Sequence, residues 1–288
     1  MVDRAEELNI PGETGDVGVA AVQTIAVASG KGGVGKTNVV ANLAIAMQRA
    51  GKRVIVIDAD LGLANVDTLL GLNPTASLRN VLRGECSIAD TLVEGPAGMR
   101  LVPAASGFEE LTQLSQEQRL QLLGQVDSLE GDCDVLLIDT GAGISQNVLF
   151  FATAAQETLV VVTPDPTSLT DAYALVKVLA TRYAEREFTV LVNMARNDWE
   201  ARKTFTQLTR VTERFLNVGL TYAGFVPHDA EVTEAVRRQQ SVLDLAPGSA
   251  AASAFTTLAA RMAAPREAVA PKGGLQFFFQ RLLAGQAG

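Results

Sequence analysis

The chain has 288 residues, of which 48% are hydrophobic, and this length and composition suffice for a sizeable core in one large α/β domain. The formal net charge of −8 disfavours non-specific DNA binding, and the lack of a secretory signal or of an apolar stretch long enough to cross a bilayer favours a cytoplasmic protein. The single histidine, His228, excludes a Ser-His triad, and the two cysteines, Cys86 and Cys133, fit a reduced cytosol and lack metal-ligand spacing.

The first predicted elements are a strand, a glycine-rich loop and a helix. Residues 1–20 are rich in Glu, Asp, Gly and Pro and predict a flexible N-terminal extension. Residues 24–29 (TIAVAS) are typical of a buried strand, and residues 38–50 repeat apolar residues at helical spacing. The loop between them reads G-x-x-x-x-G-K-T and consists of Gly30, Lys31, Gly32, Gly33, Val34, Gly35, Lys36 and Thr37, followed by Asn38.

This loop has the composition of a phosphate-binding site. Glycines let consecutive backbone N–H groups turn inward, and the helix N-terminus adds the positive end of its dipole. Lys36 would place a charge against the β- and γ-phosphates of ATP, and the Thr37 hydroxyl would be a ligand to Mg²⁺. The alternative is a glycine-rich turn that merely precedes a helix, but the order of strand, loop and helix favours the nucleotide site.

Two further predicted strands end in carboxylates. Residues 53–57 lead into Asp58 and Asp60, and residues 134–138 (DVLLI) lead into Asp139. Because the carboxyl ends of parallel strands lie at the ligand edge of an open α/β sheet, we expect these side chains beside the phosphate loop. A hydrophobic strand that ends in Asp is the Walker B arrangement, in which the carboxylate reaches Mg²⁺ through a water. The alternative to a role at the nucleotide site is that one of the two carboxylates, Asp58 or Asp60, caps the loop after its strand.

The rest of the chain predicts the remaining elements of an α/β domain. We expect helices over residues 115–129, 170–183 and 198–216, a short helix within residues 87–95, and strands over residues 99–102, 159–163, 188–192 and 220–226. In the first of these helices, Leu120, Leu123 and Val126 would face the core. The alternation of strands and helices predicts a doubly wound, mainly parallel sheet of about seven or eight strands with helices on both faces.

The C-terminal residues predict a tether and an amphipathic helix. Residues 263–274 have the Ala, Pro and Gly composition of a linker, which would close a domain spanning residues 21–262. In residues 275–284, one helical face would carry Leu275, Phe278, Phe279 and Leu282. We expect this helix to contact membrane lipid, and the alternative is that it docks on its own domain.

With Lys31 after the first glycine, the loop reads K-G-G-x-G-K-T and resembles the deviant Walker A ATPases, the family of MinD, ParA and the nitrogenase iron protein. The resemblance implies that Lys31 reaches across a nucleotide-sandwiched dimer to the partner's phosphates, where it would act in catalysis with Lys36. The alternative for Lys31 is a solvated lysine. The resemblance also implies that Asp60 orients the attacking water and that Asp58 lies in the water shell of Mg²⁺.

Other positions also match motifs of this family. The D-x-x-A-G stretch from Asp139 to Gly143 resembles its second switch, in which the position of Gly143 senses the γ-phosphate. In related ATPases, the ends of the strands predicted at residues 188–192 and 220–226 hold adenine. The residues at these two strand ends are Asn193, Pro227, His228 and Asp229.

Within the family, the stretch D-A-D-L-G-L-A-N-V-D and the terminal Q-F-F-F-Q-R-L most resemble flagellar regulators of the FlhG/FleN group. The resemblance implies a slow, Mg²⁺-dependent ATPase that dimerises with ATP, associates reversibly with the cell membrane, and controls flagellar number and placement. It implies as partners the FlhF GTPase, a FleQ-type transcriptional regulator and flagellar C-ring proteins. A MinD-type regulator of cell division and a ParA-like DNA-partition ATPase are the alternatives.

Overall fold

The computed structural model of this protein describes residues 22–63, 65–104, 114–264 and Phe277. The expected N-terminal extension and the expected membrane-contacting residues Leu275, Phe278, Phe279 and Leu282 lie outside these residues. No helix in the described ranges is both long and apolar enough to cross a membrane.

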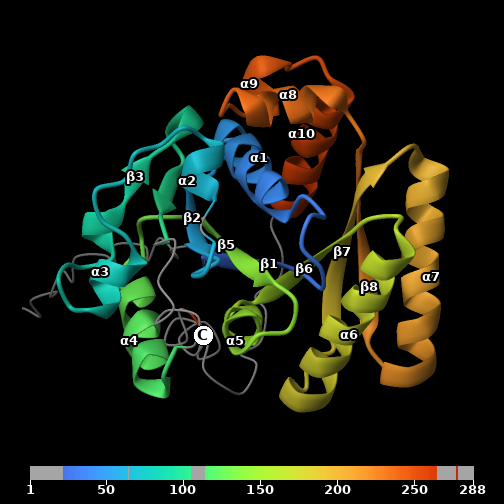
Figure 1. The fold of residues 1–288 in the computed structure, drawn as a ribbon, viewed down its shortest axis with the longest axis horizontal. Helices are drawn as coiled ribbons and strands as arrows, with labels where there is room; N and C mark the ends of the chain where they lie inside the picture. The colour runs from blue at the N-terminus through green and yellow to red at the C-terminus, as the bar shows by residue number, and fades with distance from the viewer. Residues whose placement is uncertain (1–21, 64, 105–113, 265–276, 278–288) are drawn as a thin grey trace, which may run out of the picture.

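The described residues form one eight-stranded sheet in the order β3-β4-β2-β5-β1-β6-β7-β8 (Figure 1). Neighbouring strands run parallel except for the edge pair β3 and β4, which is antiparallel. The doubly wound, mainly parallel sheet predicted from the sequence is therefore confirmed. The strands are β1 (Gln23–Ser29), β2 (Val54–Ala59), β3 (Val93–Glu94), β4 (Arg100–Val102), β5 (Val135–Ala142), β6 (Glu157–Val162), β7 (Glu187–Ala195) and β8 (Gly219–Pro227).

Helices cover both faces of this sheet (Figure 1). One face packs against α1 (Lys36–Arg49), α2 (Val66–Leu69), α8 (Ala230–Arg237), α9 (Val242–Leu245) and α10 (Ala250–Met262). The other face packs against α3 (Leu78–Leu82), α4 (Gln116–Asp127), α5 (Gln146–Ala154), α6 (Pro166–Tyr183) and α7 (Asp198–Leu216). Two short 3-10 turns, Ala89–Thr91 and Pro96–Gly98, flank β3.

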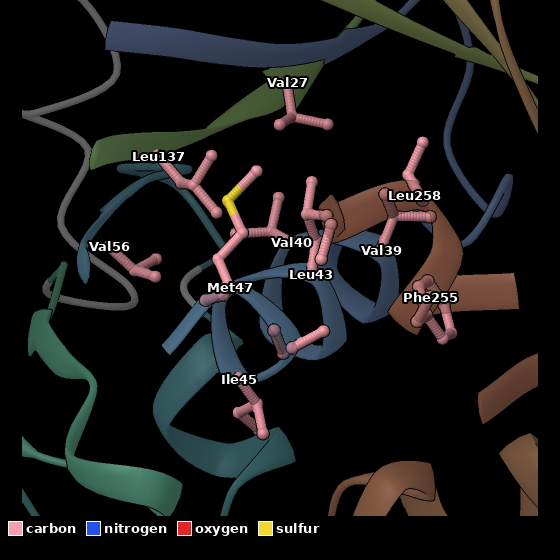
Figure 2. Close-up of a cluster of buried hydrophobic side chains, with 14 of the residues drawn as sticks. Val27, Val39, Val40, Leu43, Ile45, Met47, Val56, Leu137, Phe255 and Leu258 are labelled. Carbon is pink, nitrogen blue, oxygen red and sulfur yellow. The ribbon is translucent and has the colours of Figure 1, made fainter. Parts of the chain in front are cut away.

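The alternation of side chains along the strands explains the two layers of the core. In β2, Val54 and Val56 point toward α1, whereas Ile55 and Ile57 join the layer beneath α3, α4 and α5. Figure 2 shows Val40, Leu43 and Met47 of α1 directed at strand residues such as Leu137, while Phe255 and Leu258 of α10 lie beside Val39 on the flank of α1. Helix α1, which starts at the glycine-rich loop, is thus fixed by apolar contacts along its length.

Three local predictions differ from the structure. Residues 87–95 form a 3-10 turn and the two-residue strand β3 rather than a helix, since β3 gains a hydrogen-bonded partner in β4. In α4, Leu123 and Val126 are buried as predicted, but Leu120 is 49% exposed and Leu122 is buried in its place. Helix α6 starts at Pro166 rather than near residue 170, because Asp165 caps it and proline suits its first turn.

Candidate nucleotide site

The glycine-rich loop lies at the carboxyl end of β1, in the middle of the sheet between β5 and β6. At two positions of the loop, other parts of the chain lie so close to the backbone that only glycine fits. A Cβ atom on Gly30 would lie 2.1 Å from the backbone carbon of Asp171 in α6, and one on Gly35 would lie 2.5 Å from the Asn193 side-chain nitrogen. Gly35 also has a φ of 80°, which favours glycine. The loop is therefore held against α6 on one side and against the end of β7 on the other.

Lys36 and Asp139 form a buried ion pair at the base of this loop. The Lys36 ammonium donates to Asp139 Oδ1, and their side chains are only 8% and 1% exposed. Burial raises the pKa of Asp139, while Lys36 and a hydrogen bond with Thr37 lower it. The predicted Walker A lysine and Walker B carboxylate thus contact each other directly.

Asp58 lies opposite Asp139 on the neighbouring strand, where the two residues are register partners. Its carboxylate accepts backbone hydrogen bonds from Asp60 at 3.1 Å, from Asn65 at 3.0 Å and from Val66 at 3.1 Å. Burial, followed by repulsion from Asp139, raises the pKa of Asp58 to about 7, although these hydrogen bonds oppose the shift. Asp58 therefore caps the loop that follows β2, which is the role that the sequence left open for one of the two carboxylates.

Asp60 lies farther along the same loop and lines a cavity at the glycine-rich loop, which we call the phosphate cavity. This cavity has a volume of about 800 Å³, and its wall combines the phosphate loop with the segments after β2 and β5. It contains Lys31, Gly32, Gly33, Val34, Gly35, Lys36, Thr37, Asn38 and Asp60 from the predicted site. Three residues of the wall were not predicted from the sequence, because tertiary packing brings them there: Ser145 at the N-cap of α5, Asn147 of α5, and Gln239 after α8.

Gly143 does not line that cavity in this structure. Its amide donates to the Ser29 carbonyl oxygen at 2.9 Å, and its φ is 88°. A rotation of this peptide would be needed before the same N–H could meet a phosphate oxygen.

The residues predicted to hold adenine line a smaller adjoining cavity of about 90 Å³ together with Gly35 and Asn38. The Asn193 side chain donates to the Val34 carbonyl at 2.8 Å, and the His228 amide donates to Ala195 at 2.9 Å. Both carboxylate oxygens of Asp229 are engaged by backbone amides of the α8 and α10 first turns. Asn193 and Asp229 thus shape the cavity wall through contacts with the chain itself.

Lys31 lines the cavity at the glycine-rich loop, but its ammonium is bound at the start of α6. Its ammonium donates to Asp165 Oδ2 at 2.9 Å and to the hydroxyl of Thr167, both at the start of α6. These partners were not found from the sequence, although the Asp165-Pro166 pair is a recognisable helix start.

The chemistry of the donor set fits a magnesium ion. Within the described ranges, no group of three or more His, Cys, Asp or Glu side chains could hold a metal by itself. Mg²⁺ commonly takes one or two protein oxygens and completes its shell with phosphates and waters, so such a group is not required. Asp58 and Asp139 are each 1% exposed, and Asp139 contacts both the Lys36 ammonium and the Thr37 side chain. A cation here would stabilise both carboxylates.

The fold and this site define a P-loop nucleotide-binding protein. Residues 25–242 match the CobQ/CobB/MinD/ParA nucleotide binding domain (CbiA), and the chain belongs to that family.

Among curated proteins, the chain is 48% identical to the antiactivator FleN of Pseudomonas aeruginosa over 262 residues, covering 91% of this chain and 94% of that protein. It is 33% identical to the flagellum site-determining protein YlxH of Helicobacter pylori, covering 90% and 89% of the two chains. Among solved structures, MinD of Pyrococcus horikoshii complexed with Mg-ADP superposes with a TM-score of 0.69 at 25% identity, covering 84% of this chain and 96% of that one. The MinC:MinD complex of Aquifex aeolicus gives a TM-score of 0.70 at 27% identity, covering 88% and 100%.

Proposed function

We propose that this protein is a slow, Mg²⁺-dependent ATPase whose ATP-bound form dimerises and regulates flagellar number and placement. The observation that carries the proposal is the convergence of the phosphate loop, Lys36 and Asp60 on one cavity, with Asp58 and Asp139 buried at its base. The similarity to the solved MinD complex with Mg-ADP supports the choice of nucleotide and ion.

The phosphates of ATP would be bound by the loop amides and by Lys36. Because Lys36 is paired with Asp139, ATP binding requires Lys36 to exchange this carboxylate for phosphate oxygens. Thr37, Asp58 and Asp139 would hold Mg²⁺, which when bound neutralises negative charge on the phosphates.

Hydrolysis would depend on Asp60 and on two lysines. Asp60 would orient the attacking water, and its carboxylate lies on the cavity wall rather than at the buried base. Lys36 and the Lys31 of a second subunit would stabilise the charge that develops on the transferred phosphoryl group. Lys31 would therefore complete the site of the partner when two subunits close face to face.

The flagellar role rests on the relatives. The antiactivator FleN and the flagellum site-determining protein YlxH are each matched over at least 89% of both chains. By the same resemblance, the partners would be the FlhF GTPase, a FleQ-type transcriptional regulator and flagellar C-ring proteins, and the C-terminal helix would bring the dimer to the cell membrane. A MinD-type role in cell division is the second candidate, favoured by the superposition on MinD structures.

Deletion of the gene in its host, followed by complementation, separates these roles. We expect a change in flagellar number or position with normal division, restored by the wild-type gene and by Lys177→Ala, an exposed control in α6. Lys36→Ala should fail to complement and should lose ATP binding in calorimetry, since the main cation of the site is removed. Unchanged flagella with misplaced septa would instead support the cell-division role, and wild-type ATP affinity in Lys36→Ala would refute the proposed nucleotide site.

A further inference from the structure

Lys31 is held within its own subunit by a closed polar network at the start of α6. Its ammonium lies 2.9 Å from Asp165 Oδ2 and also donates to the Thr167 hydroxyl. That hydroxyl donates in turn to Asp165 Oδ1 at 2.9 Å, and the Thr167 amide donates to the same oxygen at 2.8 Å. Asp165 therefore caps α6 with one oxygen and receives Lys31 with the other.

This network lies beside the phosphate cavity. A separate cavity of about 340 Å³ is lined by Asp165 and Pro164 on one side and by Met194 and Arg196 on the other. Lys31 borders both this cavity and the phosphate cavity, whereas Asp165 borders only the smaller one. The ion pair thus keeps the Lys31 ammonium on the α6 side of the loop.

The contact is built on well-fixed backbone. Pro166 restricts the first turn of α6, and the backbone of α6 at Asp171 leaves no room for a side chain at Gly30, the residue before Lys31. The Lys31 ammonium depresses the pKa of Asp165 to about 2, so the carboxylate stays ionised at any physiological pH. Asp165 therefore faces the Lys31 ammonium as a carboxylate.

We propose that Asp165 is a positioning residue that retains Lys31 on its own subunit and has to release it before two subunits close around nucleotide. This inference rests on the proposed role of Lys31 at the partner's phosphates. Asp165 then competes with the partner's bound nucleotide for the same ammonium, and a bound triphosphate, with more negative charge than one carboxylate, wins that competition. Without nucleotide, Asp165 keeps Lys31 from stabilising a dimer.

The ion pair between Lys31 and Asp165 is weak enough to be released when a competing anion binds Lys31. The Lys31 and Asp165 side chains are 38% and 45% exposed, and ion pairs with this exposure shift an equilibrium by up to about fivefold. A symmetric dimer releases two such pairs, so their loss should strengthen ATP-dependent dimerisation by about 2- to 25-fold.

Asp165→Asn tests this inference. Asparagine caps a helix as well as aspartate does, so α6 should keep its start while Lys31 loses its ionic partner. Asp198→Asn is the matched control, because Asp198 is an exposed carboxylate in the first turn of α7 that pairs with Arg202 at 2.6 Å. The dimer dissociation constant is measured by analytical ultracentrifugation with Mg²⁺ and a hydrolysis-resistant ATP analogue. We expect about 2- to 25-fold tighter dimers for Asp165→Asn and no change for Asp198→Asn.

A second readout uses the nucleotide-free monomer. The rate at which an N-hydroxysuccinimide ester acetylates Lys31, followed by mass spectrometry, should rise several-fold in Asp165→Asn and stay at the wild-type value in Asp198→Asn. An unchanged acetylation rate, or a dimer that is weaker or no tighter than wild type, would overturn the role of Asp165. If the acetylation rate rises but the wild-type chain never dimerises with the analogue, the proposed dimeric function fails, and the release step fails with it.

Discussion

Substitution of Asp60 should slow ATP hydrolysis while leaving ATP affinity nearly unchanged. It lines the phosphate cavity, and its carboxylate accepts a hydrogen bond from the Leu63 amide at 3.3 Å. Asp60→Ala should therefore leave ATP bound within about threefold and slow hydrolysis by about 100-fold or more, the usual cost of losing a group that activates water. Affinity is measured by calorimetry and turnover by phosphate release.

Asp67→Ala provides the control for this variant, because Asp67 belongs to the first turn of α2 and does not line the cavity. Its turnover should match the wild type. An unchanged turnover rate in Asp60→Ala would remove Asp60 from the reaction.

Asp58 makes the nucleotide-free protein sensitive to pH. Its pKa is raised from 3.8 to about 7 in the folded chain, chiefly by burial, and burial raises the pKa of Asp139 as well. The folded state then binds protons more tightly than the unfolded state, so the stabilising effect is complete below about pH 4 and is lost as the pH rises through 7. The free energy of unfolding should fall by about 2–3 kcal/mol between pH 5 and pH 8.

Urea unfolding across this range, without nucleotide or Mg²⁺, measures the effect. Asp58→Asn, which cannot ionise, should show a clearly shallower decline with pH than the wild type. Parallel pH profiles for the two proteins would show that Asp58 does not titrate in this range.

The roles that could be predicted from the sequence are those that depend on residue type and on the spacing of residues within a motif. Lys36, Thr37 and Asp139 were assigned because a phosphate loop and a strand-terminal carboxylate need these residue types, and the structure brings them together. The pairing of Lys31 with Asp165 was not predictable, because it joins the ends of two strands more than a hundred positions apart. The engagement of Gly143 with Ser29 depends likewise on the conformation of one peptide.

At the level of elements, long strands and helices were predicted well and short ones poorly. The bounds expected for α7 match those observed, since its charged and apolar residues alternate with helical period over many turns. The segment around β3 was predicted as helix, because two residues carry too little pattern and its state is set by pairing with β4. The same limit explains α4, whose apolar face is too sparse to fix which of its leucines are buried.

The packing of the phosphate loop against α6 gives a prediction about elements. In Gly30→Ala, the new methyl group would meet the Asp171 backbone at 2.1 Å, and a helix backbone cannot rotate away as a side chain can. Either the loop or α6 has to shift, so the variant should lose about 3 kcal/mol of unfolding free energy, the upper end for overpacked sites.

Gly32→Ala is the matched control, because open space surrounds its Cβ position and its φ is not positive. Its stability should stay within about 0.5–1 kcal/mol of wild type. Both are measured by chemical denaturation without nucleotide. Equal stability of the two variants would mean that α6 does not pack against Gly30 in solution.

For the whole molecule, Phe277 links the C-terminal residues to the body of the domain. It is fully buried in the layer beneath α3, α4 and α5, stacks on Phe151 at a centroid distance of 6.5 Å, and donates its amide to the Ala154 carbonyl at 3.0 Å. This contact satisfies a carbonyl at the end of α5 that the helix leaves without a partner. Because Phe277 belongs to the core, the C-terminal segment contributes a residue to the folded domain in addition to any membrane contact.

Phe277→Ala should therefore lower the free energy of unfolding by about 3–5 kcal/mol, the usual loss for a large aromatic side chain removed from a core. Phe215→Ala, at a position that is 62% exposed at the end of α7, is the control and should change stability by less than about 0.5 kcal/mol. Chemical denaturation of both variants and the wild type measures the difference. If Phe277→Ala unfolds like the wild type, residue 277 does not rest on α5 in solution, and the segment that contains it is free to serve the membrane alone.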